Sequence, residues 1–158
     1  MKIKLLILTA FLSAGFCSCR PGQPLMDETV SFPNHAWNRF RVLSFHPELP
    51  KEDGCYDVKV RIVVSDDFAF SEVPIHTVLK SPDGQVNVMR KVVGVRKADG
   101  SHEGTVFGDS WTVEKTIYSQ RKFSQKGTYT FEVQQMTQYY DLNGIEAVSC
   151  VILPTKAS

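Results

Sequence analysis

The amino-acid sequence predicts an all-β fold, an antiparallel β-sandwich of about seven or eight strands. Short runs rich in β-branched and aromatic residues recur along the chain, with turn-forming residues between them. Such residues fit the pleated, half-buried surface of a sheet. Beyond the N-terminal apolar run, no segment shows apolar spacing typical of an amphipathic helix. About 140 residues remain for folding, which is enough for one domain with one core.

The expected strands follow one another at short intervals. The clearest alternation places Tyr56, Val58, Val60 and Ile62 on one face and mostly charged residues on the other. The Ser-Pro-Asp-Gly sequence at 81–84 predicts a tight turn between two neighbouring strands. In chain order, the sequence predicts strands at 37–45, 56–62, 75–79, 85–93, 111–117, 129–133 and 145–153.

The N-terminus predicts a bacterial lipoprotein signal peptide over residues 1–18. A short basic start is followed by an apolar run over residues 5–16, too short for a permanent membrane span. Ser18 supplies the small residue that the signal peptidase requires before Cys19, whereas bulky Phe16 precedes Cys17. We therefore expect lipidation at Cys19, with two acylations giving a stable anchor. The alternative is an ordinary signal cleavage that releases the protein.

The rest of the chain divides into a tether and a single domain. Residues 19–35 contain several Pro, Gly and Asn residues and no helix signal, so they are expected to form the lipidated N-terminus and tether. Residues 36–158 are expected to form the β-sandwich.

Composition and motifs exclude several functional classes. Lys and Arg number 18 and Asp and Glu 17, so no basic stripe indicates a nucleic-acid partner. The sequence contains no phosphate-binding glycine loop and no Gly-x-Ser-x-Gly elbow. Its four histidines lack metal-ligand spacing, and Asp66-Asp67 is interpreted as a solvated turn rather than a calcium site. The sequence therefore predicts a protein that is not an enzyme, with no cofactor and no metal.

Two cysteines remain after signal removal and lipidation. The compartment beyond the inner membrane is oxidising, so a disulfide between Cys55 and Cys150 is allowed. Two separate buried thiols are the alternative. The sequence leaves this choice open, because it does not show whether the two backbones come close enough.

The best candidate for a binding site is the pair Tyr139-Tyr140, which precedes Asp141-Leu142-Asn143-Gly144. Neighbouring residues of an extended chain face opposite ways, so at least one tyrosine is expected to be exposed. Exposed tyrosines are favoured in protein interfaces. The alternative is that one of them closes the end of the core.

A series of short motifs, several of them containing glycine, follows in order along the chain. They are Asp99-Gly100, Gly104, Gly108-Asp109, Phe123, Gly127-Thr128-Tyr129-Thr130-Phe131, Gln135-Met136 and Leu142-x-Gly144-Ile145. The glycines at 100, 104 and 108 also suit tight bends with positive φ. The order and spacing of these motifs resemble those of the GldH-type gliding-motility lipoproteins of Bacteroidetes, from about Trp37 to Leu153. Two departures are His102, where the family commonly has Trp, and Thr137, where it commonly has Arg.

The resemblance implies a β-sandwich lipoprotein of the outer membrane that is not an enzyme. Acidic residues directly after the lipidated cysteine favour surface export of lipoproteins in that phylum, and none occurs here before Asp27, so a periplasm-facing position is expected. Its implied partners are envelope proteins of the gliding machinery and, in related systems, of the linked secretion apparatus. The alternative function is that of a glycan-binding accessory lipoprotein of polysaccharide uptake. That alternative requires a flat aromatic platform, such as Trp111 together with Tyr139 or Tyr140.

Overall fold

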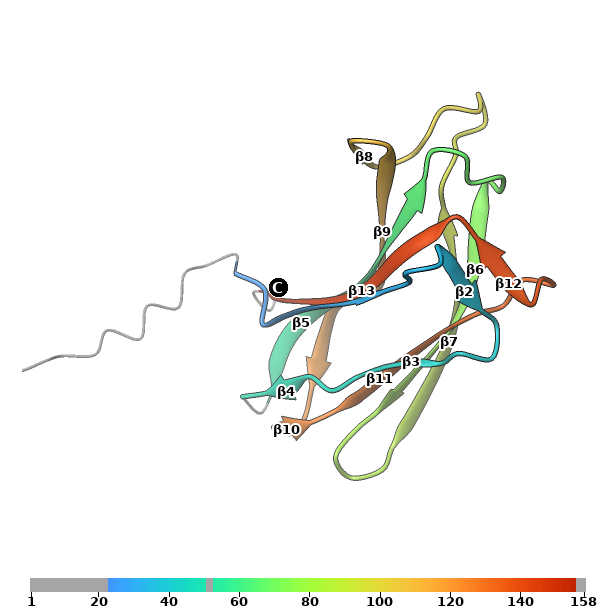
Figure 1. Cartoon of the computed structure of the whole chain (residues 1–158). Coiled ribbons are helices and arrows are strands. Elements are labelled where there is room, and N and C mark those ends of the chain that lie inside the picture. Colours follow the sequence, from blue (N-terminus) through green and yellow to red (C-terminus); the bar gives the residue numbers. More distant parts are fainter. Residues whose placement is uncertain (1–22, 51–52, 156–158) are drawn as a thin grey trace, which may run out of the picture.

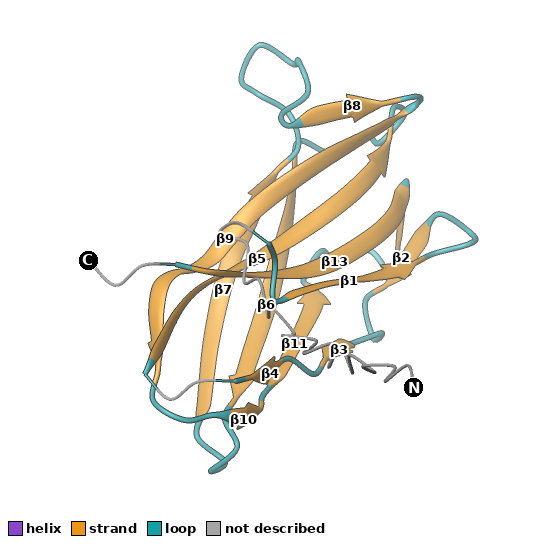
Figure 2. Ribbon diagram, turned by 90° about the vertical axis from the view of Figure 1, so that its left-hand side faces the viewer, coloured by secondary structure: helices purple, strands orange, loops and turns teal. Residues whose placement is uncertain are grey.

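The computed structural model describes residues 23–50 and 53–155 and shows an all-β fold, as the sequence predicts (Figures 1 and 2). All strand pairs are antiparallel. The larger sheet contains, in spatial order, β1 (Met26–Ser31), β13 (Ile145–Pro154), β5 (Gly54–Ser65), β9 (Ser110–Phe123) and β8 (Thr105–Phe107). The smaller sheet contains β3 (Leu43–Phe45), β11 (Thr130–Gln135), β6 (Glu72–Lys80) and β7 (Val86–Gly94).

Two short strand pairs extend the ends of the sandwich. Strand β10 (Gly127–Thr128) pairs with β4 (Glu48–Leu49), and β12 (Asp141–Asn143) pairs with β2 (Ala36–Asn38). The second pair joins segments about a hundred positions apart, with Leu142 opposite Trp37. Both side chains are fully buried, so this pair closes one end of the core.

The core lies between the two sheets and follows the alternation of the strands. Along β5, Tyr56, Val58, Val60 and Ile62 are buried, as the sequence predicts. Across the core, Phe131 of β11 is fully buried in the same hydrophobic cluster. The opposite face of the larger sheet carries charged side chains, among them Lys59, Arg61 and Glu114, which are partly exposed to water.

The prediction that residues 19–35 form a tether is wrong for much of that segment. Met26–Ser31 forms β1, which pairs with β13 along its whole length, and Phe32 belongs to the core. The sequence did not reveal this strand because β1 is an edge strand with mostly exposed positions, so it carries no apolar alternation. The folded domain therefore begins at about Leu25, whose backbone N–H donates to the carbonyl of Ile152.

Cys55 and Cys150 are free thiols in this structure. Cys150 pairs with Val60, five positions along β5 from Cys55, which corresponds to roughly 17 Å of strand. The two thiols also lie on opposite faces of the sheet, since Cys55 has the phase of the outward residues and Cys150 is fully buried. This separation is too large for a disulfide, which requires Cα atoms within about 7 Å.

Candidate functional site

The segment between β11 and β12 is organised by one buried amide side chain. Gln135, at the end of β11, is buried, and its Nε2 donates to the carbonyls of Trp37 and Tyr139, each at 3.3 Å. Its Oε1 accepts from the backbone N–H of Thr137 at 2.8 Å and from the Thr137 hydroxyl at 2.6 Å. The four bonds fix the path of the chain through residues 136–140. Sequence reasoning assigned no role to Gln135 at the site.

Both tyrosines of the predicted pair are exposed, Tyr139 by 44% and Tyr140 by 67%. Tyr139 contacts Phe70, which follows β5, with ring centroids 5.0 Å apart. Tyr140 contacts Phe40, which follows β2, at 5.8 Å. Phe40 is itself 69% exposed. The structure therefore joins the tyrosine pair to two phenylalanines that the sequence did not place beside it.

Arg39 contacts both Phe40 and Tyr140. Its backbone N–H donates to the carbonyl of Tyr140 at 2.7 Å, and its own carbonyl accepts from the side-chain amide of Gln134 at 2.6 Å. The guanidinium carbon lies 5.7 Å from the centroid of the Phe40 ring and 5.9 Å from that of Tyr140. Both distances lie within the usual range of cation–π contacts. We call Arg39, Phe40, Phe70, Tyr139 and Tyr140 the aromatic surface.

The aromatic surface lies at the end of the domain away from the start of β1. Met26, the first residue of β1, pairs with Ile152 near the end of β13, whereas the aromatic surface adjoins the first residue of β13, Ile145. Seven strand positions separate Ile145 from Ile152, or roughly 23 Å. In Figure 1 the start of β1 lies on the left and β12 on the right.

A cavity of ≈ 290 Å³ adjoins the aromatic surface on the Tyr139 side. Phe70 and Tyr139 contribute its aromatic wall, and Asp67, Asp141 and Asn143 contribute polar groups. Gly144 is also part of the lining and has a φ of 87°, a conformation that suits glycine. Its carbonyl accepts from the N–H of Ser65 at 2.9 Å, so the end of β5 and the start of β13 are held together beside the cavity.

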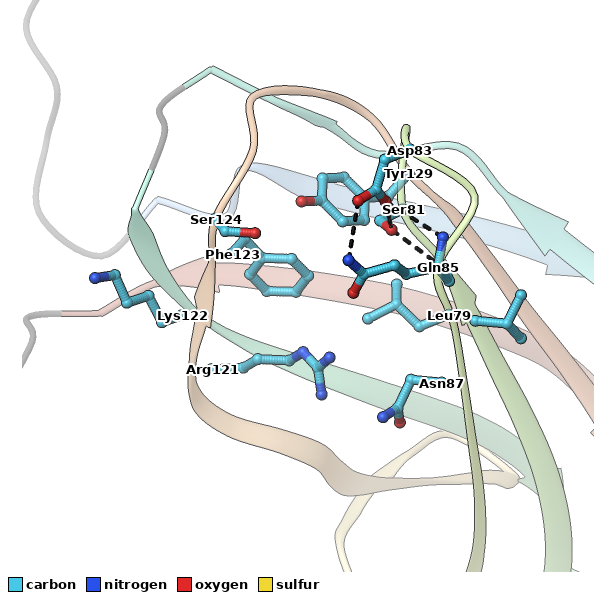
Figure 3. A pocket seen from close by; sticks show the side chains of 11 residues that line it. Leu79, Ser81, Asp83, Gln85, Asn87, Arg121, Lys122, Phe123, Ser124 and Tyr129 are labelled. Carbon is cyan, nitrogen blue, oxygen red and sulfur yellow. Dashed lines mark hydrogen bonds between the residues drawn. The ribbon is translucent and has the colours of Figure 1, made fainter.

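A smaller cavity of ≈ 120 Å³ lies between the β6–β7 turn and the end of β9 (Figure 3). The Asp83 carboxylate accepts from the Ser81 hydroxyl, from the Gln85 side-chain amide at 3.0 Å and from Gln125 at 2.9 Å. The Ser81 bond is the main cause of a lowered Asp83 pKa, followed by the backbone N–H of Gln85. The hydrogen bonds of Asp83 therefore stabilise the predicted turn at 81–84. The Arg121 guanidinium lies over the Tyr118 ring at 4.4 Å.

Trp111 lies in a separate cluster. Its ring stacks on His102 with centroids 4.2 Å apart and planes 11° apart, and its Nε1 donates to Asp66 at 3.1 Å. His102, the departure from the family's usual Trp, thus supplies a flat ring at this position. The described residues include no group of three or more His, Cys, Asp or Glu side chains suited to a metal ion.

The expected signal peptide over residues 1–18 and the expected lipidation site Cys19 lie outside the described residues. Within the part of the chain that the structure describes, no helix is long and apolar enough to cross a membrane.

Comparison with known proteins shows similarity to gliding-motility lipoproteins. Residues 25–152 match the model of the GldH lipoprotein family. A relative from Christiangramia forsetii (strain DSM 17595 / CGMCC 1.15422 / KT0803), named gliding motility lipoprotein GldH homolog, is 26% identical over 132 residues. The aligned region covers 83% of this chain and 80% of the relative.

Proposed function

Because this chain belongs to the GldH lipoprotein family, we propose that it is a lipid-anchored envelope protein that binds another protein of a gliding-type machinery. In this proposal it is not an enzyme, and it acts from the outer membrane while facing the periplasm. The partner is a component of the gliding machinery or of the secretion apparatus linked to it. The observation that carries the proposal is the aromatic surface.

The composition of the aromatic surface supports a protein partner. Tyrosine, phenylalanine and arginine are enriched in protein interfaces, and tyrosine and arginine often carry much of the binding energy. The rings project from segments whose backbones are fixed by hydrogen bonds, among them the bond from Arg39 to Tyr140 and the bonds made by Gln135. A fixed backbone lowers the entropy lost when a partner binds.

The position of the surface supports a partner located away from the membrane that carries the anchor. Cys19 stands four positions before Gln23, the first described residue, so a lipid at Cys19 would hold that end of the domain within roughly 14 Å of the membrane. The aromatic surface lies beyond the far end of β13 and would project into the periplasm.

The geometry of the rings argues against the glycan-binding alternative. The flat platform that this alternative requires is not formed by these rings, because the Phe70–Tyr139 pair is tilted by 43° and the Phe40–Tyr140 pair by 46°. Trp111, which was expected to form the platform together with Tyr139 or Tyr140, stacks on His102 instead. We therefore treat retention on polysaccharide as an outcome of the test and not as the proposed function.

The proposal is tested with the double variant Phe40→Ser/Tyr140→Ser, which removes two exposed rings and leaves Gln135 unchanged. The matched control, Val86→Ser/Val88→Ser, removes exposed apolar side chains from β7. Each protein is expressed in its native host and purified after detergent extraction, and partners that co-purify are quantified by mass spectrometry. Anchors of this kind are worth about 2 kcal/mol or more, roughly thirtyfold in affinity.

We expect the aromatic variant to lose a partner that the wild type and the valine control both retain. Normal recovery of every envelope partner by a folded aromatic variant would refute the proposal. Loss of retention on polysaccharide gels, with normal protein partners, would instead support the glycan-binding alternative.

A further inference from the structure

The cavity beside Tyr139 has a chemical character that the rest of the aromatic surface lacks. Two segments distant in sequence form its walls. Asp67 and Phe70 come from the β5–β6 connection, and Tyr139, Asp141 and Asn143 come from the chain around β12. A volume of ≈ 290 Å³ is at the lower limit of ligand pockets, which span about 300–1,000 Å³. The cavity is thus suited to one side chain of a partner.

The two carboxylates of the cavity are bonded only to neutral donors. Asp67 accepts from the Ser65 hydroxyl at 2.5 Å, and Asp141 accepts from the Asn38 side-chain amide at 2.8 Å. Among the ion pairs of the described residues, none involves either carboxylate. Both side chains belong to exposed residues, so the cavity carries two negative charges that no cation of the described residues neutralises in an ion pair.

The nearby cations are engaged elsewhere. Arg96 donates to the backbone carbonyls of Phe68 at 2.9 Å and Asp66 at 3.3 Å. Arg39 lies over Phe40 and Tyr140, on the other side of the tyrosine pair. Neither guanidinium forms an ion pair with a carboxylate of the cavity.

The aromatic wall of the cavity attracts cations, as the two carboxylates do. The faces of aromatic rings carry partial negative charge, so a cation near Phe70 or Tyr139 gains cation–π energy in addition to the attraction of the carboxylates. An anion is repelled by both groups, and an apolar side chain would desolvate the carboxylates without compensation.

We propose that this cavity receives a lysine or arginine side chain of the partner protein. The inference rests on the proposed function, because the cavity adjoins the surface assigned to that partner. It adds the chemistry of the contact: the partner presents a cationic side chain that enters between the Phe70–Tyr139 wall and the Asp67 and Asp141 carboxylates.

The test uses the processed chain from residue 19, with Cys19→Ser in place of the lipidated residue, and follows its backbone amide signals by NMR. The probes are N-acetylarginine amide and its neutral analogue N-acetylcitrulline amide. We expect saturable shifts at Tyr139 and Asn143 with arginine, at a Kd of about 1–10 mM. Citrulline should bind at least about fivefold more weakly, because it lacks the charge.

The variant Asp67→Asn/Asp141→Asn should abolish the preference for arginine over citrulline and retain a dispersed, folded spectrum. The control Asp83→Asn changes a carboxylate of the other cavity and should leave the preference intact. Equal shifts with both probes, or no saturable shift at these residues in the folded wild type, would overturn the inference.

Co-purification separates failure of this inference from failure of the proposed function. If the aspartate double variant retains the partner that Phe40→Ser/Tyr140→Ser loses, the aromatic surface stands and the cationic contact is refuted. If both double variants retain all partners, the proposed function itself fails.

Discussion

Truncation of Phe131 to alanine is the most direct test of how the two sheets pack. Phe131 is fully buried in β11, opposite Phe45 of β3 on one side and Leu79 of β6 on the other. A buried phenylalanine removes about 150–250 Å² from water, and its replacement by alanine also leaves a cavity. Phe131→Ala should therefore lower the free energy of unfolding by about 3–5 kcal/mol.

Phe40→Ala is the matched control, because the same atoms are removed from a ring that is 69% exposed. Its main loss is the contact with Tyr140, so the expected cost is below about 1 kcal/mol. Urea titrations followed by tryptophan fluorescence measure both costs, and buried Trp37 is a suitable reporter. At a slope of about 2 kcal/mol/M, Phe131→Ala should move the midpoint by roughly 2 M. Similar costs for both variants would show that the packing described for β11 is wrong.

Four further measurements test the anchor, the thiols, a tight turn and the topology. Cys19→Ala should abolish incorporation of a fatty-acid analogue, and undiminished label would move the anchor to another residue. In a chain without the signal cysteines, Cys55 should react with a maleimide in the native state and Cys150 only after unfolding, because burial raises the Cys150 pKa to about 12; equal reactivity would contradict this. Gly104→Ala should lower the free energy of unfolding more than Gly100→Ala. Both glycines have positive φ, but an added Cβ at Gly104 would lie 2.0 Å from the Thr112 carbonyl oxygen, whereas at Gly100 it meets nothing within 4 Å. Protease added to intact cells should leave the protein uncut until the outer membrane is permeabilised, and rapid cutting of intact cells would place it on the surface.

Much of the fold could be predicted because its central strands carry a strong alternating pattern. Tyr56, Val58, Val60 and Ile62 report one buried face directly, and the turn at 81–84 lies between β6 and β7 as expected. The edge strand β1 carries no such pattern, because its side chains are mostly exposed and its pairing with β13 depends on backbone hydrogen bonds. Backbone pairing is nearly independent of sequence, so a strand of this kind is hidden from pattern analysis.

Whether Cys55 and Cys150 can form a disulfide depends on the strand register, which could not be predicted from the sequence. Cys55 lies in β5 and Cys150 in β13, which are neighbouring strands of the larger sheet. The register places Cys150 beside Val60, on the opposite face from Cys55. A one-residue change in register reverses the faces of a whole strand, so spacing along the chain carries little information about such a pair.

The aromatic surface, to which we assign the proposed binding, could be predicted only in part from the sequence. Exposure of at least one tyrosine followed from the alternation of an extended chain, and the structure exposes both. Their partners Phe40 and Phe70 come from connections far away in sequence, and the pairing of β12 with β2 brings the first of them into place. Gln135 was missed because a buried glutamine at the end of a strand has no sequence pattern of its own.

The same organisation explains why a binding surface would form at the end of the sandwich and not on the outer face of the larger sheet. On that face, Arg61 pairs with Asp27 at 3.1 Å and Lys59 with Glu114 at 2.9 Å, so a partner would have to desolvate several charges. At the end of the domain, the rings are already partly desolvated by one another, and Gln135 satisfies the backbone groups beneath them. Binding there displaces water mainly from aromatic surface, which favours association. The two carboxylates beside Tyr139 then supply selectivity, because they favour a cationic side chain over a neutral one.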